Sequence, residues 1–162
     1  MLPLYNNILV TTDFTPNSEN AFRHAVMLAR LNDARIHLLH VIQQVDPAMH
    51  NFVSTVIGED RLAEYEKNNM EKARSELKKR LDHFINSELA TFPNDRKHIA
   101  DTVVTIGHPV VKILAEAKRL DADVIVMGTH SKGALEQAFL GSVTEKVLRK
   151  ANRPVFAIPL PA

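Results

Sequence analysis

The chain has 162 residues, of which 45% are hydrophobic and 24% are charged, as in ordinary soluble globular domains. This length supports one hydrophobic core, so we expect residues 1–162 to form a single domain. The 20 Lys and Arg residues are balanced by 19 Asp and Glu residues and are interleaved with them, which disfavours nucleic acid as a partner. Cys is absent, which excludes disulfides, thiolate metal sites and Cys nucleophiles.

The N-terminal residues contain no basic segment followed by an apolar core, and no apolar run reaches about 18 residues. We therefore expect neither a secretory signal nor a membrane span. The absence of Cys agrees with a reducing compartment. The sequence favours a cytoplasmic location without a membrane partner.

Strand and helix patterns alternate in the first part of the chain. Residues 8–11 are apolar and of β type, which predicts a buried strand. Thr15 followed by Pro supplies an N-cap and a first helical residue, and apolar positions at helical spacing predict a helix from about residue 16 to 31. Residues 34–42 are a second apolar run. The segment is therefore a βαβ unit, whose two strands are parallel.

The middle of the chain has a different pattern. Residues 43–58 lose periodicity, and we expect a mobile, partly ordered insertion there. Residues 60–85 have apolar positions at helical spacing and charges elsewhere, which predicts a long amphipathic helix covering one side of a sheet. The remaining predicted elements are a strand at 98–107, a helix at 108–121, a strand at 122–128, a helix at 142–150 and a strand at 153–160.

Five strands alternating with four helices predict an α/β fold, and the continuous apolar strands indicate a doubly wound parallel sheet with helices on both faces. In such folds, ligands bind beyond the carboxyl ends of the strands, at the point where the strand order reverses. The candidate positions are therefore Thr11, Thr12 and Asp13 at the end of the first strand, Val41 and Ile42 at the end of the second, Gly107 and His108 at the end of the third, and the loop after Met127.

Gly141, Ser142, Val143 and Thr144 begin the predicted helix at 142–150 and form a candidate phosphate site. Unpaired backbone N–H groups and the positive end of the helix dipole can hold a phosphate without a basic side chain. The hydroxyls of Ser142 and Thr144 can donate to phosphate oxygens. The alternative is a capping box formed by Ser142 and Glu145, which requires no ligand.

Three further residues add to this candidate site. Gly128 ends its strand and gives a second point of close backbone approach at the same edge of the sheet, which favours a ligand. Asp13 can accept hydrogen bonds from ribose hydroxyls or from an amino group on a base, and the alternative is a local role in a turn. Val41 can line an apolar slot for a flat ring, or it packs in the core.

Several other chemistries are disfavoured. Ala134-Leu135 stands where a P-loop needs Lys and then Ser or Thr. His37 and His40 lie three residues apart on a strand and so point to opposite faces, which disfavours a metal pair. The third strand ends in TIGHP without an acceptor Asp, which disfavours a phosphoacceptor receiver domain. No residue stands out as a general base, so we expect no catalytic residue and no metal ligand.

The sequence resembles the universal stress protein (UspA-like) family along essentially its whole length. The resemblance is carried by ILVTTDFTPNSENAFRHAVMLA, IHLLHVI, GHPVVKILAEAKRLDADVIVMGTH and FLGSVTEKVLRKANRPVFAIP. The nucleotide-binding branch of the family has Gly, two residues, Gly, nine residues, then Gly and Ser or Thr. This chain keeps that spacing with Gly128, Ser131, Gly141 and Ser142, so Ser131 replaces the middle Gly.

The resemblance implies the strand order 3-2-1-4-5, a homodimer formed through the last strand around PVFAI, and ATP or AMP as the ligand, with Mg²⁺ accompanying ATP. It also implies that Asp13 meets the ribose or the base and that Val41 lines the adenine pocket. The residues implied near the ribose and phosphates are Met127, Gly128, Thr129 and His130, and those implied to bind the phosphates are Gly141, Ser142, Val143 and Thr144.

Three functions follow from these patterns. The first is a dimeric stress-response module that binds an adenine nucleotide and acts in signalling or regulation. The second is a nucleotide-free module of the same fold, in which the insertion at about 46–58 recruits an unknown protein partner. The third is a slow ATPase or a protein that phosphorylates itself on Ser142 or Thr144. Ser131 bears on the choice, because a positive φ there would cost about 1–2 kcal/mol and leave AMP or no ligand.

Overall fold

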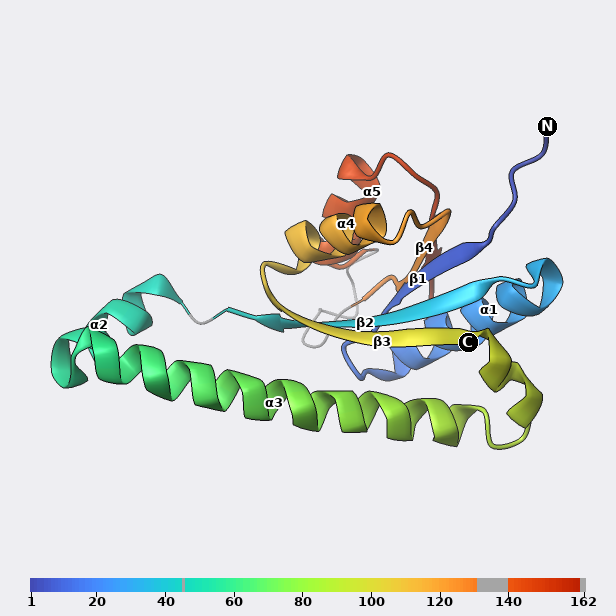
Figure 1. Ribbon diagram of the computed structural model, residues 1–162. Coiled ribbons are helices and arrows are strands. Elements are labelled where there is room, and N and C mark those ends of the chain that lie inside the picture. Colours follow the sequence, from blue (N-terminus) through green and yellow to red (C-terminus); the bar gives the residue numbers. More distant parts are fainter. Residues whose placement is uncertain (45, 131–139, 161–162) are drawn as a thin grey trace.

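The computed structural model describes residues 1–44, 46–130 and 140–160. Its centre is one five-stranded parallel sheet in the order β3-β2-β1-β4-β5 (Figure 1). This order and the parallel pairing confirm the predicted doubly wound sheet and the order implied by the family resemblance. The strands are β1 (Asn7–Thr11), β2 (Arg35–Gln43), β3 (Ile99–Gly107), β4 (Val124–Gly128) and β5 (Val155–Ile158).

Helices cover both faces of the sheet, as predicted. One face carries the first and third helices, and the other face carries the fourth and fifth (Figure 1). In the part of the chain that the structure describes, no helix combines the length and the apolar character needed to cross a membrane. The helices are α1 (Pro16–Asn32), α2 (Pro47–Ile57), α3 (Glu59–Glu88), α4 (Pro109–Arg119) and α5 (Ser142–Lys150), with a 3₁₀ helix η1 at Pro93–His98.

The central strand β1 is buried on both faces, because successive side chains of a strand point to opposite sides. Ile8 and Val10 belong to the core that contains Phe22 of α1 and Leu81 of α3. Leu9 belongs to the second core, beneath α4 and α5. Each fully buried side chain of this size contributes about 1.5–3 kcal/mol relative to exposure. The two cores fix the strand from both sides and so hold its carboxyl end in a defined place.

The start of α1 follows the predicted capping. Thr15 has extended backbone geometry, and its side chain accepts a hydrogen bond from the N–H of Ser18. Pro16 then occupies the first helical position, where its missing N–H leaves no bond unmade. The helix therefore begins immediately after the short loop that leaves β1.

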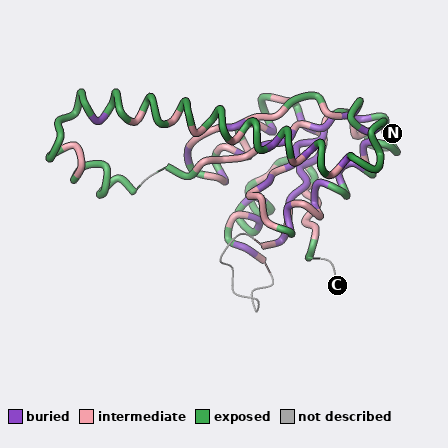
Figure 2. Tube along the Cα trace, turned by 90° about the horizontal axis from the view of Figure 1, so that it is seen from below, coloured by how far each residue is buried: buried purple, intermediate pink, exposed green. Residues whose placement is uncertain are grey.

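Residues 47–57 form the helix α2, where the sequence predicted no regular element. Asp46 caps this helix by accepting a hydrogen bond from the N–H of Ala48 at 2.9 Å. The helix contacts α3, and the two form an arm that extends away from the sheet (Figure 2). None of the residues of α2 is buried, and Met49, Phe52 and Val56 are strongly exposed. Because α2 contributes nothing to the main core, its sequence lacks the periodicity that a core-facing helix requires.

Candidate functional site

A cavity of about 460 Å³ lies at the carboxyl edge of the sheet. Strand β1 stops at Thr11, which pairs with Leu39, whereas β2 continues to Gln43. The shorter central strand leaves room between the ends of β2 and β4, where the strand order reverses. The volume falls within the range of small-molecule sites, about 300–1,000 Å³.

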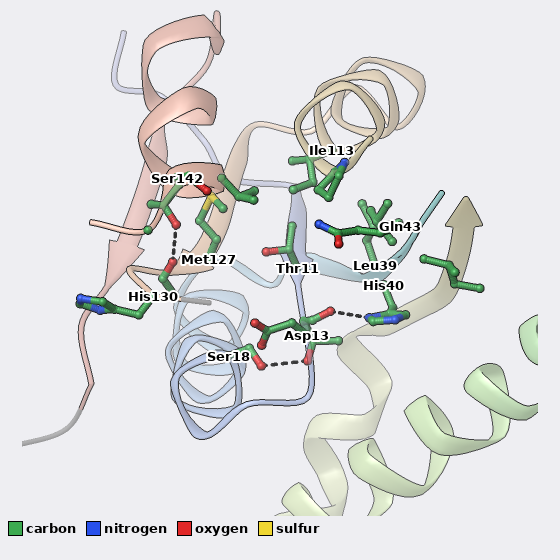
Figure 3. A pocket seen from close by; sticks show the side chains of 18 of the residues that line it. Thr11, Asp13, Ser18, Leu39, His40, Gln43, Ile113, Met127, His130 and Ser142 are labelled. Carbon is green, nitrogen blue, oxygen red and sulfur yellow. Dashed lines mark hydrogen bonds between the residues drawn. The ribbon is translucent and has the colours of Figure 1, made fainter. Parts of the chain in front are cut away.

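The cavity brings together most of the residues predicted from the sequence (Figure 3). Thr129 is buried and does not line the cavity, since its backbone binds Ile158 and Gly141 and its hydroxyl binds the ring of His130. Ser131 lies outside the described residues. The predicted residues that do line the cavity are Thr12, Asp13, Val41, Met127, Gly128, His130, Gly141, Ser142, Val143 and Thr144.

Sequence reasoning missed lining residues from several elements. His40 and Pro109 follow the general rule that sites form at the carboxyl ends of parallel strands, so that rule could have found them. Leu77 lies on α3, and no local pattern indicates which turn of a long helix reaches the end of the sheet. The candidate positions Thr11 and Ile42 also line the cavity, whereas the candidate positions Gly107 and His108 do not. The missed lining residues are Ser18, Leu39, His40, Gln43, Leu77, Pro109 and Ile113.

The cavity has an apolar side and a polar side. Leu39, Ile113 and Met127 belong to the core beneath α4 and α5, and Val41 packs against that core. These side chains offer a surface for a flat apolar ring. His40 precedes Val41 on β2, so its side chain points to the opposite face of the sheet, where it contacts the ring of Phe14. A site with mainly apolar walls and a few placed polar groups is typical for small organic ligands.

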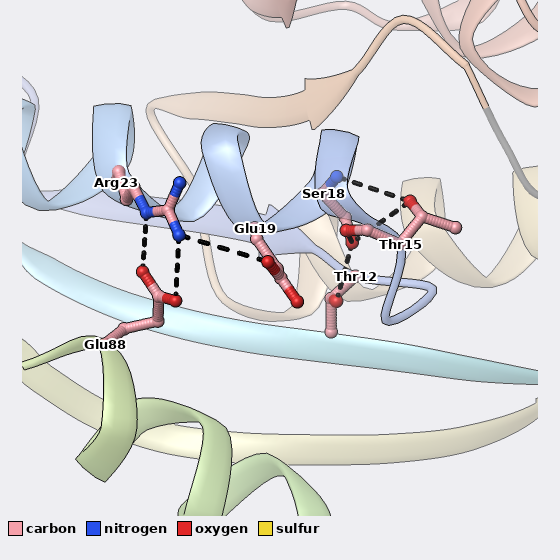
Figure 4. Close-up of polar contacts among 6 residues, drawn as sticks. All are labelled: Thr12, Thr15, Ser18, Glu19, Arg23 and Glu88. Atoms are coloured by element: carbon pink, nitrogen blue, oxygen red, sulfur yellow. Dashed lines mark hydrogen bonds and ion pairs between the residues drawn. The ribbon is translucent and has the colours of Figure 1, made fainter. Parts of the chain in front are cut away.

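The loop after β1 is held by its own polar groups (Figure 4). The hydroxyls of Thr12 and Ser18 lie 3.0 Å apart, and Thr12 Oγ1 also accepts from the N–H of Phe14 at 3.0 Å. Asp13 Oδ1 accepts from the N–H of Thr15 at 3.1 Å and from its hydroxyl at 2.5 Å. Asp13 therefore makes a local turn and lines the cavity as well, so the two roles considered for it are compatible.

Position 128 has no room for a side chain, because the side chain of Asn17 fills the adjacent space. A Cβ at this position would lie 2.7 Å from both Cγ and Oδ1 of Asn17. Asn17 is 2% exposed, donates to the carbonyl of Ile158 at 2.9 Å, and accepts from the N–H of His130 at 2.7 Å. The close approach predicted at Gly128 is thus explained by Asn17, a residue that the sequence analysis overlooked.

The first turn of α5 does not form the capping box that the sequence offered as an alternative. Gly141 is the N-cap, and Ser142 is already the first helical residue, so Ser142 and Glu145 do not form the capping box. Glu145 pairs with Arg149 at 2.7 Å. The hydroxyl of Thr144 donates to the carbonyl of Gly128 at 2.7 Å, so its proton is engaged within the protein in this structure. Among the described residues, no side chain caps this helix.

The electrostatic character of the cavity comes from few groups. Its ionisable lining residues, in the described part of the chain, are Asp13, His40 and His130. His40 Nδ1 lies 2.8 Å from the carbonyl of Thr12, which can only accept, so Nδ1 carries the proton of this hydrogen bond. His37 instead binds Asp101, 2.5 Å away on β3. The attraction for an anion therefore comes mainly from the N–H groups and dipole of α5.

Comparisons with known proteins agree with this fold. The family model described as "Universal stress protein family" matches residues 4–159. The universal stress protein MJ0577 of Methanocaldococcus jannaschii is 30% identical over 164 residues, which cover 98% of this chain and 97% of that protein. Its solved structure aligns with a TM-score of 0.76 at 28% identity and covers 98% of this chain and 99% of that chain.

A second solved structure is that of a universal stress protein in complex with cAMP. It covers 98% of this chain and 99% of its own, with a TM-score of 0.61 and 18% identity, which supports the fold alone. The family model spans nearly the whole sequence and includes every described residue that lines the cavity. The chain therefore belongs to the universal stress protein family.

Proposed function

We propose that the protein is a dimeric, cytoplasmic module that binds an adenine nucleotide, ATP or AMP, and acts in stress signalling or regulation. The observation that carries this proposal is one cavity that joins an apolar slot to the helix N-terminus of α5. The apolar slot suits the flat ring of a base, and the helix N-terminus suits a phosphate. The cytoplasmic location rests on the sequence alone.

The nucleotide has a consistent orientation in this proposal. The adenine lies against Val41 and Met127, and the ribose or the base edge meets Asp13. The phosphates meet the backbone N–H groups of Ser142 and Val143 at the start of α5. The described lining contains neither Lys nor Arg, so Mg²⁺ would neutralise part of the charge of ATP. A universal stress protein with the same fold has been solved in complex with cAMP, which is itself an adenine nucleotide.

The dimer in this proposal forms through β5. In the described structure, β5 pairs with β4 on one side, and its residues Val155–Ile158 are all half-buried. An edge strand of this kind is a template for pairing with a second copy. Light scattering during size-exclusion chromatography should give twice the chain mass of 18.2 kDa. A monomer mass at micromolar concentration would refute this part of the proposal.

The second candidate function is a nucleotide-free interaction module. The exposed apolar side chains of α2, which include Met49, Phe52 and Val56, favour it, because apolar surface gathered on one helix often marks a protein contact. The two candidates differ in whether the cavity takes a nucleotide. One binding experiment therefore separates them.

Thermal unfolding with and without ATP, ADP or AMP plus Mg²⁺ tests the proposal, after heat extraction has removed any bound nucleotide. A ligand at about one hundred times its Kd adds about 2.7 kcal/mol, which raises the Tm by about 5–10 °C for a chain of this size. Gly141→Val should abolish the shift, because φ −68 and ψ 154 tolerate Val while the added side chain crowds the N–H groups of α5. Val111→Ala, on the exposed face of α4, is the matched control and should keep the shift. An unshifted wild-type Tm would favour the nucleotide-free module.

A further inference from the structure

Phe14 has a backbone conformation that is unusual for a bulky residue. Its φ is 62°, in the left-handed region, and it directly follows Asp13 in the loop that borders the cavity. Aromatic residues rarely adopt this region, because the Cβ crowds the neighbouring carbonyl. Strain of this kind persists only where surrounding contacts impose it, and it concentrates at functional sites.

Two side chains contact the ring of Phe14. The guanidinium of Arg80 lies 3.9 Å from the centre of the Phe14 ring, which is a cation–π contact. The ring of His40 lies 4.8 Å away, with a 48° angle between the two planes. His40 is itself fixed to the carbonyl of Thr12. The loop that presents Asp13 is therefore held from β2 on one side and from α3 on the other.

Helix α3 has two further connections to this region. Leu77, one turn before Arg80, lines the cavity. Glu88, near the end of α3, forms a two-pronged ion pair with Arg23 of α1, at 2.6 and 3.0 Å (Figure 4). From this anchored part, α3 continues outward to the arm that carries α2 (Figure 1). A change in the loop after β1 therefore acts on a helix that extends well beyond the site.

We propose that Phe14 is a positioning residue, which through its contact with Arg80 holds Asp13 toward the nucleotide cavity and couples occupancy of that cavity to α3. This inference rests on the proposed nucleotide-binding function. When Arg80 holds the ring, the strained loop is already in the binding conformation, and the nucleotide does not have to order it. By linkage, a nucleotide that fixes the loop also stabilises the contact of Phe14 with α3.

A double-mutant cycle on AMP affinity tests the coupling. Phe14→Leu removes the aromatic ring and keeps its bulk, and Arg80→Met removes the charge and keeps most of the length. Each substitution should weaken AMP binding about twofold to fivefold, the factor that corresponds to about 0.5–1 kcal/mol for an exposed cation–π contact. The double variant should be no weaker than the weaker single variant, because both changes remove one interaction. Arg80→Lys should restore most of the affinity, and Arg74→Met, another exposed arginine of α3, should leave it unchanged.

Hydrogen exchange gives a readout that a merely structural role would not change. Saturating AMP should slow the exchange of α3 amides at residues 77–88 in the wild type, and this protection should be lost in Arg80→Met. Because Arg80 is exposed, that variant should fold, and it carries the test if Phe14→Leu does not fold. If the chain binds AMP but the losses of affinity in Phe14→Leu and Arg80→Met are strictly additive, the coupling is refuted and the proposed function is not. The same holds if AMP still slows the exchange of the α3 amides in Arg80→Met. A wild-type chain that does not bind AMP or ATP would refute the proposed function, and the inference with it.

Discussion

Gly128→Ala is the sharpest test of how the site is built. The added Cβ would lie 2.7 Å from two atoms of Asn17, and that side chain is 2% exposed and has little room to move. Its displacement would break the hydrogen bonds with Ile158 and His130, each of which contributes about 0.5–1.5 kcal/mol. Overpacking adds about 1–3 kcal/mol.

Together these terms predict that Gly128→Ala lowers the free energy of unfolding by about 2–6 kcal/mol, and the Tm by about 4–24 °C. Urea denaturation of the ligand-free protein measures the free energy directly. The matched background is Asn17→Ala, which removes the clashing amide, and in that background Ala at position 128 should cost less than about 0.5 kcal/mol. If the full cost persists there, contact with Asn17 is not the reason that position 128 holds Gly.

Two further predictions concern stability. Thr144→Val keeps the side-chain shape but leaves the carbonyl of Gly128 without its donor, so urea denaturation should show a loss of about 1–3 kcal/mol. Asp95 is hydrogen-bonded by Arg30, Nε to Oδ1 at 2.7 Å, which lowers the pKa of Asp95 below 3.8. A lowered folded-state pKa stabilises the protein above the unfolded pKa, and this contribution is lost as the pH falls through the folded value. Asp95→Asn should therefore be less stable than the wild type at pH 7, and denaturation curves should converge below about pH 4. A difference in stability that stays constant from pH 7 to pH 3 would contradict this assignment.

Local patterns predicted most of the fold. Continuous apolar runs such as residues 124–128 identify strands buried on both faces, and the cap at Thr15 identifies the start of α1. These signals are local, so they survive without any knowledge of the partners. The helix α2 was not predicted, because its exposed apolar residues face no core and produce no core-directed periodicity.

Most residues predicted for the site line one cavity, and their roles toward a ligand stay predictions. Ligands of parallel sheets bind at the carboxyl ends of the strands, and Asp13, Val41 and Ser142 do line one cavity at that edge. Gly128 and Thr144 also line this cavity, but the structure gives them partners inside the protein. A sequence shows that a Gly or Thr is present, and it does not show whether a ligand or a side chain occupies the space beside it.

The sequence by itself determined the alternation of strands and helices, the parallel sheet and the edge at which a ligand can bind, because these depend on periodicity and on the chirality of βαβ connections. Only the tertiary structure decided which residues from distant parts of the chain meet. Asn17 fills the space beside Gly128, and Arg80 reaches the ring of Phe14 from more than sixty positions away in the chain. Such contacts depend on how whole elements pack together, and no short stretch of sequence encodes that packing.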